Sequence, residues 1–170
     1  TILDLGAEEF TSGRPHPMMD PSVRRQHLLA LARQPQVAVI LCDVILGWGA
    51  HVDPAGALAS AWQEASRIAQ DAGRSMIGIA TVCGTSGDPQ GLSGQRHILQ
   101  EHGLLLADNN LQAVQFAAAV VGKSVPPAVP LQLSPFEDVT ATAAAALSPV
   151  TLPARLPALF ADGPRVINIG

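Results

Sequence analysis

The residues best suited to chemistry lie in one short stretch of the chain, Gly13-Arg14-Pro15-His16-Pro17. An arginine can hold a carboxylate or a phosphate through two parallel hydrogen bonds. A histidine can act as acid, base or anion donor near neutral pH, and the flanking prolines stiffen the backbone of His16. Arg14 and His16 are therefore the candidate catalytic residues. The plainer alternatives are a structural salt bridge for Arg14 and a bond from His16 to a backbone carbonyl.

Two glycine-rich stretches, Gly47–His51 and Gly84–Gly87, follow apolar runs and can bring bare backbone amides close to an anion. Neither is a Walker loop, because no lysine follows, and neither has the spacing of a dinucleotide fingerprint. Tight turns also need glycine for their backbone conformation, so a purely structural role stays open. The predicted anion-binding residues of the whole site are Gly13, Arg14, His16, Asp43, Gly47, Gly49, His51, Gly84 and Thr85, and we predict no metal site.

Asp43 interrupts an otherwise apolar run that reads as a buried strand. A buried carboxylate needs a partner, because its charge is costly to remove from water. We expect Arg14 to be that partner, in an ion pair that joins the first two loops.

An Asp-Pro pair occurs three times after an apolar run and a polar loop: Asp20-Pro21, Asp53-Pro54 and Asp88-Pro89. Aspartate at an N-cap accepts from the free N–H groups of a helix, and proline fits the first helical position. The pairs therefore predict three helix starts. A carboxylate in that position also repels a second anion, which weighs against a phosphate at the helix terminus itself.

Strand-like and helix-like segments alternate along the chain, which predicts right-handed βαβ units and a parallel sheet. We expect strands at 2–5, 36–46, 75–82 and 104–106, and helices at 21–33, 54–72, 89–102 and from 109 or 110 to 121, with Arg24 and Arg25 facing outward. The predicted fold class is α/β, a three-layer doubly wound parallel sheet of flavodoxin-like type with a Pro/Ala-rich C-terminal extension. A flavodoxin-like sheet usually has one strand more than the four predicted here. All strand-to-helix loops of such a sheet lie at one edge, where α/β folds bind ligands.

Composition changes sharply after Lys123, where eight prolines interrupt a tract rich in alanine, leucine, serine and threonine. We predict a flavodoxin-like domain at 1–123, a Pro/Ala-rich connector at 124–163 and, at 164–170, the strand-like start of a further segment. The chain begins and ends inside strand-like runs, so we expect a fragment of a longer protein.

Charge and cysteine content exclude several classes of function. The formal net charge is −4 and no basic run is visible, so we expect no nucleic-acid partner. No apolar stretch reaches the ~18 residues that span a bilayer, and no membrane association is expected. Cys42 and Cys83 suit neither a zinc cluster nor a disulfide framework, and we interpret both as core residues. With no signal peptide, free thiols predict a cytoplasmic protein.

Four stretches of the chain resemble the FdrA family of acyl-CoA-synthetase-like proteins: Ile2–Gly6, Gly13–Pro21, Asp43–Ala55 and Val82–Gln90. The unusual Gly-Arg-Pro-His-Pro sequence makes this resemblance specific. It covers residues 1–123, and Val166–Gly170 is similar to the family's next segment. More distantly, the layout is similar to the C-terminal ligase domain of the β-type subunits of succinyl-CoA synthetase.

The resemblance implies a parent protein with a CoA-binding Rossmann domain and further flavodoxin-like domains. In the synthetases a phosphohistidine moves between helix N-termini of two subunits or domains. Its Gly-His-Ala-Gly motif is absent here, since Gly49-Ala50-His51 has a different order, and so is the nucleotide-grasp domain. We therefore expect the fragment alone to be inactive and without a cofactor, and CoA and a nucleotide to bind in the full-length parent.

The resemblance thus predicts a domain of an FdrA-like acyl-CoA synthetase, similar to succinyl-CoA ligase, that binds a small anionic acyl or phosphoryl group at its strand-to-helix loops. Its expected partners are that substrate and the other domains or subunits of the parent. One alternative is a carbamoyltransferase component of purine-ureide breakdown, acting on allantoin-derived compounds such as oxamate. Another is a non-catalytic scaffold domain, which the missing phosphohistidine motif and the occupied helix caps favour.

Overall fold

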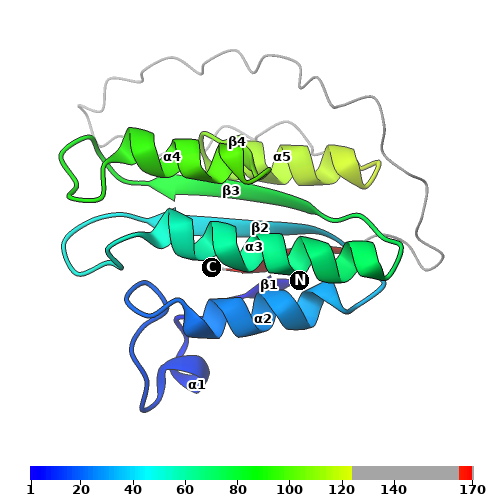
Figure 1. Ribbon diagram of the computed structural model, residues 1–170, viewed down its shortest axis with the longest axis horizontal. Coiled ribbons are helices and arrows are strands. Elements are labelled where there is room, and N and C mark those ends of the chain that lie inside the picture. The colour runs from blue at the N-terminus through cyan, green and yellow to red at the C-terminus, as the bar shows by residue number, and fades with distance from the viewer. Residues whose placement is uncertain (124–164, 170) are drawn as a thin grey trace, which may run out of the picture.

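The structure is a computed structural model that describes residues 1–123 and 165–169. In chain order, the helices and strands in these ranges are β1 (Ile2–Leu3), α1 (Glu8–Thr11), α2 (Ser22–Ala32), β2 (Val37–Ile45), α3 (Pro54–Asp71), β3 (Ile77–Cys83), α4 (Leu92–Glu101), β4 (Leu105–Ala107), α5 (Asn110–Val120) and β5 (Arg165–Ile169). Strands and helices alternate from β1 to α5, as predicted (Figure 1).

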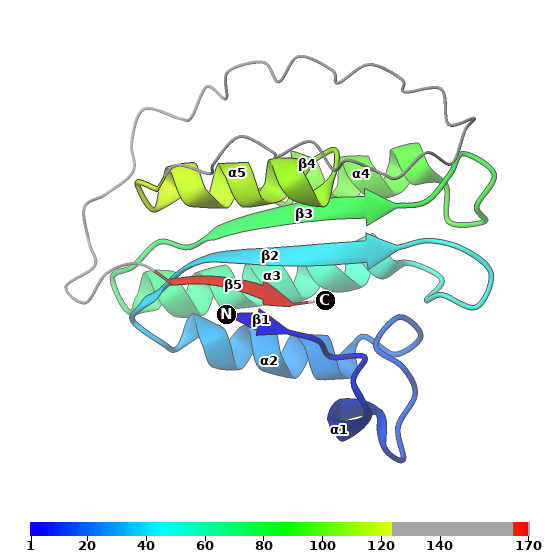
Figure 2. The same ribbon diagram turned by 180° about the vertical axis from the view of Figure 1, so that it is seen from behind.

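The five strands form one parallel sheet in the order β1-β5-β2-β3-β4. β5 comes last in the chain and yet lies inside the sheet, between β1 and β2 (Figure 2). Counted from β5, the order becomes two-one-three-four-five, which is the flavodoxin-like order. The α/β, doubly wound, flavodoxin-like fold is thus confirmed. The strand predicted to begin a further segment at 164–170 instead supplies the fifth strand of this sheet.

Helices cover both faces of the sheet, which makes the three layers. α2, α3 and α4 lie in front of the sheet in Figure 1, whereas α5 lies on the opposite side, which faces the viewer in Figure 2. Two hydrophobic clusters match these layers: a larger one beneath α2, α3 and α4, and a smaller one beneath α5. β2 contributes to both, because Val37–Leu41 is buried on both faces. One predicted surface residue belongs to the interior: Arg24 on α2 is buried, while Arg25 is exposed.

The long helix α3 packs closely on β3 because the strand carries a glycine at the contact. A Cβ atom added to Gly78 would lie 2.9 Å from the ring of Trp62, which is itself buried. The absence of a side chain at Gly78 therefore permits the close packing of α3 on this strand. Real Cβ atoms do not approach a ring this closely, so the aromatic ring occupies the space that any larger residue needs.

Element boundaries depart most from the predictions after the first strand and at the start of α4. The first strand ends at Leu3, and the following loop contains the short helix α1. α4 begins at Leu92 and not at Pro89, because Gly91 takes a positive φ of 75° immediately before it. The predicted connector at 124–163 lies outside the described residues, and the domain boundaries stay predictions. No helix within the described residues is long and apolar enough to cross a bilayer.

The contact between Gly78 and Trp62 can be tested with two alanine variants. Gly78→Ala forces a methyl group against the indole ring, and we expect a loss of about 1–3 kcal/mol in the free energy of unfolding. Gly94→Ala is the matched control, since Gly94 is exposed in α4 with open space around it. It should be neutral or stabilising by up to about 1 kcal/mol. Urea unfolding measures both, and equal stabilities would contradict the packing argument.

Candidate functional site

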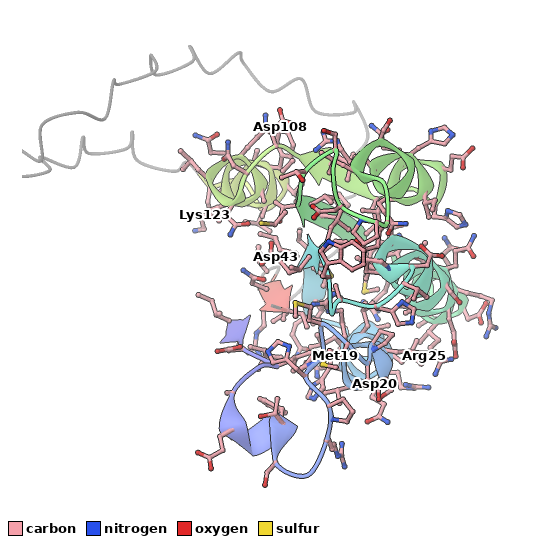
Figure 3. All side chains as sticks on the ribbon, turned by 90° about the vertical axis from the view of Figure 1, so that its left-hand side faces the viewer. Met19, Asp20, Arg25, Asp43, Asp108 and Lys123 are labelled. Carbon is pink, nitrogen blue, oxygen red and sulfur yellow. The ribbon has the colours of Figure 1, made fainter. Side chains whose placement is uncertain are left out.

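The carboxyl edge of the sheet carries three loops that follow β1, β2 and β3. We call residues 12–21, 46–53 and 84–91 the first, second and third loops, and the three together the rim. Figure 3 looks onto this edge, with the strands end-on between the helical layers. Because all the strands are parallel, the rim is the place where an α/β fold binds its ligands.

Hydrogen bonds join the three loops to one another. In the second loop, the N–H of His51 donates to the carbonyl of Met18 in the first loop at 2.8 Å. The side chain of Gln90, in the third loop, accepts from the N–H of Gly47 at 3.1 Å and donates to its carbonyl at 2.9 Å. The same amide also donates to the carbonyl of His51 at 3.2 Å. The rim is therefore one connected surface.

A second glutamine connects α4 to the start of α3. The buried side chain of Gln95 accepts from the N–H of Ala55 at 2.8 Å and donates to the carboxylate of Asp53 at 3.0 Å. Asp53 also accepts from the N–H of Gly56 at 3.0 Å. Neither Gln90 nor Gln95 was predicted as a site residue. The available signals were that Gln90 ends one of the four stretches that resemble FdrA proteins, and that a side-chain amide can donate and accept at once.

The three Asp-Pro pairs behave differently in the structure. Asp53 is the N-cap of α3 with Pro54 after it, as predicted. Asp20 lies one residue before the N-cap position of α2, and its carboxylate accepts from the N–H of Ser22 at 2.9 Å. Asp88 caps no helix. Its carboxylate accepts from the N–H of Thr85 within the third loop, so the prediction of a helix start there is wrong.

The carboxylate of Asp20 is stabilised in its charged form. The backbone N–H of Ser22 contributes most, the hydroxyl group of Ser22 and the positive charge of His51 contribute less, and together they lower the pKa of Asp20 below its ordinary value. Figure 3 shows Asp20 together with Met19 and Arg25 where the first loop enters α2.

The candidate catalytic residues Arg14 and His16 are both exposed in the first loop. Nδ1 of His16 accepts from the N–H of Met18 at 3.1 Å. Its Nε2 lies against Gly6, where an added Cβ atom would come within 2.6 Å. The imidazole therefore has a defined orientation. Because Nδ1 accepts a hydrogen bond, the proton of the neutral ring lies on Nε2.

The predicted ion pair between Arg14 and Asp43 does not form. Asp43 instead accepts a hydrogen bond from the hydroxyl group of Thr81 on the neighbouring strand β3. That hydroxyl group also contacts the side-chain oxygen of Asn110 on α5 at 3.3 Å, so Asp43 faces the α5 side of the sheet. In Figure 3 Asp43 is correspondingly far from the start of α2. Asp43 is half-buried, and a hydroxyl group satisfies its carboxylate without a second charge.

Several of the predicted backbone donors already have acceptors inside the rim. The N–H of Gly47 donates to Gln90, and that of Thr85 donates to Asp88. Gly49 takes a φ of 94° and has open space around it, whereas a Cβ atom on Gly84 would lie 2.7 Å from Leu46. Gly84 is thus required for packing. Within the described ranges, no three His, Cys, Asp or Glu side chains are grouped as metal ligands.

The two cysteines differ in their environments. Cys42 is buried in β2, and burial raises the pKa of its thiol to about 11. Cys83, at the end of β3, is exposed at the rim, so its interpretation as a core residue is wrong. β3 ends at this residue, and the chain turns into the third loop.

One protein family and one relative of this chain were found by comparison with known proteins. A family profile described as CoA-ligase matches residues 1–120. The uncharacterized protein YahF of Escherichia coli strain K12 is 44% identical over 110 residues, which is 65% of this chain and 21% of that protein. The chain therefore corresponds to about a fifth of the length of this relative.

The difference between the two thiols predicts their reactivity. Thiolates are the reactive form, so exposed Cys83 should react quickly with an aromatic disulfide reagent at pH 8, and Cys42 only after unfolding. We expect one fast equivalent in the native protein and two in urea. Cys83→Ser should abolish the fast equivalent, and Cys42→Ser should leave it. Two equally fast thiols in the native protein would contradict the burial of Cys42.

The bridge made by Gln95 can be tested by removing its amide. Gln95→Leu retains most of the buried volume but leaves the N–H of Ala55 without an acceptor, which should cost about 1–3 kcal/mol of unfolding free energy. Gln100→Leu on the same helix is the control, because Gln100 is exposed. It should change stability by less than about 0.5 kcal/mol. Urea unfolding of both variants measures these changes in unfolding free energy. A similar loss of stability in both variants would refute the bridging role of Gln95.

Proposed function

The chain belongs to the CoA-ligase family, and on that basis we propose that its rim holds a small anionic acyl or phosphoryl group for an acyl-CoA synthetase of the succinyl-CoA ligase type. The resemblance of Gly13–Pro21 to FdrA proteins supports the finer assignment to an FdrA-like enzyme. The chain spans about a fifth of its relative YahF. We therefore assign the binding of CoA and nucleotide, and completion of the reaction, to other domains or subunits of a longer protein.

The observation that carries this proposal is the hydrogen bonding between the loops. Gln90 holds the backbone of the second loop on both sides of Gly47, and the second loop holds the first through His51 and Met18. Donors fixed in this way need no reorganisation when charge develops on a bound group, and such preorganisation is a main source of electrostatic stabilisation in enzymes.

Two side chains of the first loop, Arg14 and His16, provide the side-chain donors of the proposed site. Arg14 is exposed and has no carboxylate partner within residues 1–123 and 165–169, so its guanidinium group is available to a ligand. It can clamp a carboxylate or a phosphoryl group through two parallel bonds. His16, fixed through Nδ1, presents Nε2 as a donor beside Gly6.

Backbone amides contribute less than the sequence predicted. The amides of Gly47 and Thr85 are engaged within the rim, so the proposed amide donors are those of Gly49 and Gly84. These two amides are few donors with which to stabilise the negative charge of a bound ligand. Arg14 is therefore the principal cation in the proposal.

The proposal is tested by titrating the isotopically labelled chain with inorganic phosphate, oxamate and CoA in separate experiments. We expect saturable amide shifts at 13–16, 47–51 and 84–87 with at least one of the small anions. Arg14→Ala should weaken that binding about tenfold or more, since a hydrogen bond to a charged group contributes about 1.5–3 kcal/mol. Arg67→Ala is the control, because exposed Arg67 pairs with Asp71 near the far end of α3.

Three results would count against the proposal. No shifts at millimolar ligand would mean that the described loops do not form a binding site, which is what a scaffold domain predicts. Shifts that survive Arg14→Ala unchanged would remove the principal cation from the site. A preference for oxamate over phosphate would direct the assignment toward carbamoyl chemistry and away from phosphoryl chemistry.

A further inference from the structure

A groove with room for a small molecule lies at the amino edge of the sheet, opposite the rim. Three segments line it: the later half of α3, Ser75 and Met76 at the entry to β3, and His102 and Gly103 directly after α4. α3 and α4 lie next to each other in front of the sheet (Figure 1). The space in the groove is about 420 Å³, within the range of about 300–1,000 Å³ that is usual for small-molecule sites.

Trp62 contributes to this groove a buried donor that has no acceptor. The residue is only 4% exposed, and its ring packs against Gly78. In the part of the chain that the structure describes, the indole Nε1–H makes no hydrogen bond. Within that part, the unpartnered side-chain atoms that are closed off from solvent belong to Arg24 and Asn168.

The N–H of Trp62 therefore reaches solvent although the residue is buried, and the groove that Trp62 lines is the place where it does so. An indole N–H can donate a hydrogen bond but cannot accept one. A ligand in the groove therefore has to present an oxygen or nitrogen acceptor to the floor.

The walls of the groove are polar and nearly uncharged. Two carboxamides and two hydroxyl groups line them: Gln63, Gln70, Ser66 and Ser75. His102 adds an acceptor, because its Nδ1 donates to the carbonyl of Ile98 at 2.7 Å and Nε2 of the neutral ring keeps its lone pair. Among the described residues that line the groove, Arg67 alone carries a permanent charge, and it pairs with Asp71 at 3.2 Å. A charged ligand therefore finds no free counter-charge.

We propose that this groove, which we call the Trp62 groove, binds a neutral polyhydroxy compound, namely a sugar of one or two rings. Each sugar hydroxyl group donates and accepts, which matches the carboxamides and hydroxyl groups of the walls. A sugar oxygen takes the N–H of Trp62 at the floor. The edge of the indole ring and the half-buried side chain of Met76 suit the C–H groups of a sugar ring. A hydrocarbon suits the groove less well, because it leaves the indole N–H without an acceptor.

The Trp62 groove goes beyond the function proposed for the rim. The two lie at opposite edges of the sheet, and no residue of the rim lines the groove. Inorganic phosphate should shift amides of the rim and leave those at 62–76 unchanged, whereas a sugar should do the reverse. Either proposal can therefore fail while the other stands.

The test is titration of the isotopically labelled chain with glucose, galactose and maltose, with the indole N–H signal of Trp62 as the readout. The chain has two tryptophans, and a Trp48→Phe variant assigns their two indole signals. We expect at least one sugar to move the Trp62 signal saturably, with a millimolar dissociation constant. The amides at 62–76 and 102–103 should move with it. Glucuronate, an anionic counterpart of glucose, should bind at least fivefold more weakly than glucose.

Two variants and a matched control locate the binding. Ser66→Leu places a hydrocarbon side chain at the half-buried wall of the groove and should weaken sugar binding at least tenfold. Ser93→Leu is the control, since Ser93 is exposed in α4 and does not line the groove. Trp62→Phe keeps an aromatic ring against Gly78 and removes the N–H, and it should weaken binding several-fold, as measured from the backbone amides.

Three results would overturn the proposal. The first is a Trp62 indole signal that none of the three sugars moves at tens of millimolar. The second is binding of glucuronate as tight as that of glucose, which would indicate an anion site. The third is undiminished sugar binding by the Ser66→Leu protein, which would place the bound sugar elsewhere.

Discussion

Parallel pairing of β2 with β3 determines where these two strands end relative to each other, and therefore where the second and third loops of the rim begin. The register aligns Ile45 with Cys83, and one residue later the N–H of Leu46 donates to the carbonyl of Cys83 at 2.9 Å. The second and third loops therefore leave the sheet side by side. Only with this alignment can one side chain, that of Gln90, reach both backbone groups of Gly47. The rim is thus held by a ladder of strand hydrogen bonds that continues into side-chain amides.

Local patterns in the sequence predicted the parts of the fold that depend on near neighbours. Asp53 before Pro54 caps α3, and Asn109 caps α5 by accepting from the N–H of Gln112. Asp88 before Pro89 carries the same local signal but no helix begins there, because Gly91 takes a positive φ and delays α4 to Leu92. The two Asp-Pro pairs differ in the backbone turn that follows them, and the residues of the pair do not determine that turn.

Contacts between distant segments were out of reach of the sequence analysis. The partner of Asp43 is Thr81, directly across the strand pair, and finding it requires the register of β2 on β3. The outward assignment of Arg24 failed for a related reason: helical periodicity places charged residues on the exposed side, but here the helix turns one arginine of an adjacent pair toward the sheet. Gln90 and Gln95 carry no local signal of their contacts, and only the packed structure shows what they contact.

The place of β5 has a consequence for how this domain folds. Thr1 and Ile2 lie beside Val166 and Asn168, so the hydrogen bonds of β1 close a loop of almost the whole chain. The α3–β3–α4–β4 region can form from contacts close in sequence, whereas β1 gains its sheet partner only when the last strand arrives. High sequence separation slows folding, because chain entropy is lost before the contact is gained. During synthesis, then, the earliest strand of this sheet is among the last of its strands to be fixed, and the first loop acquires its final position at that step.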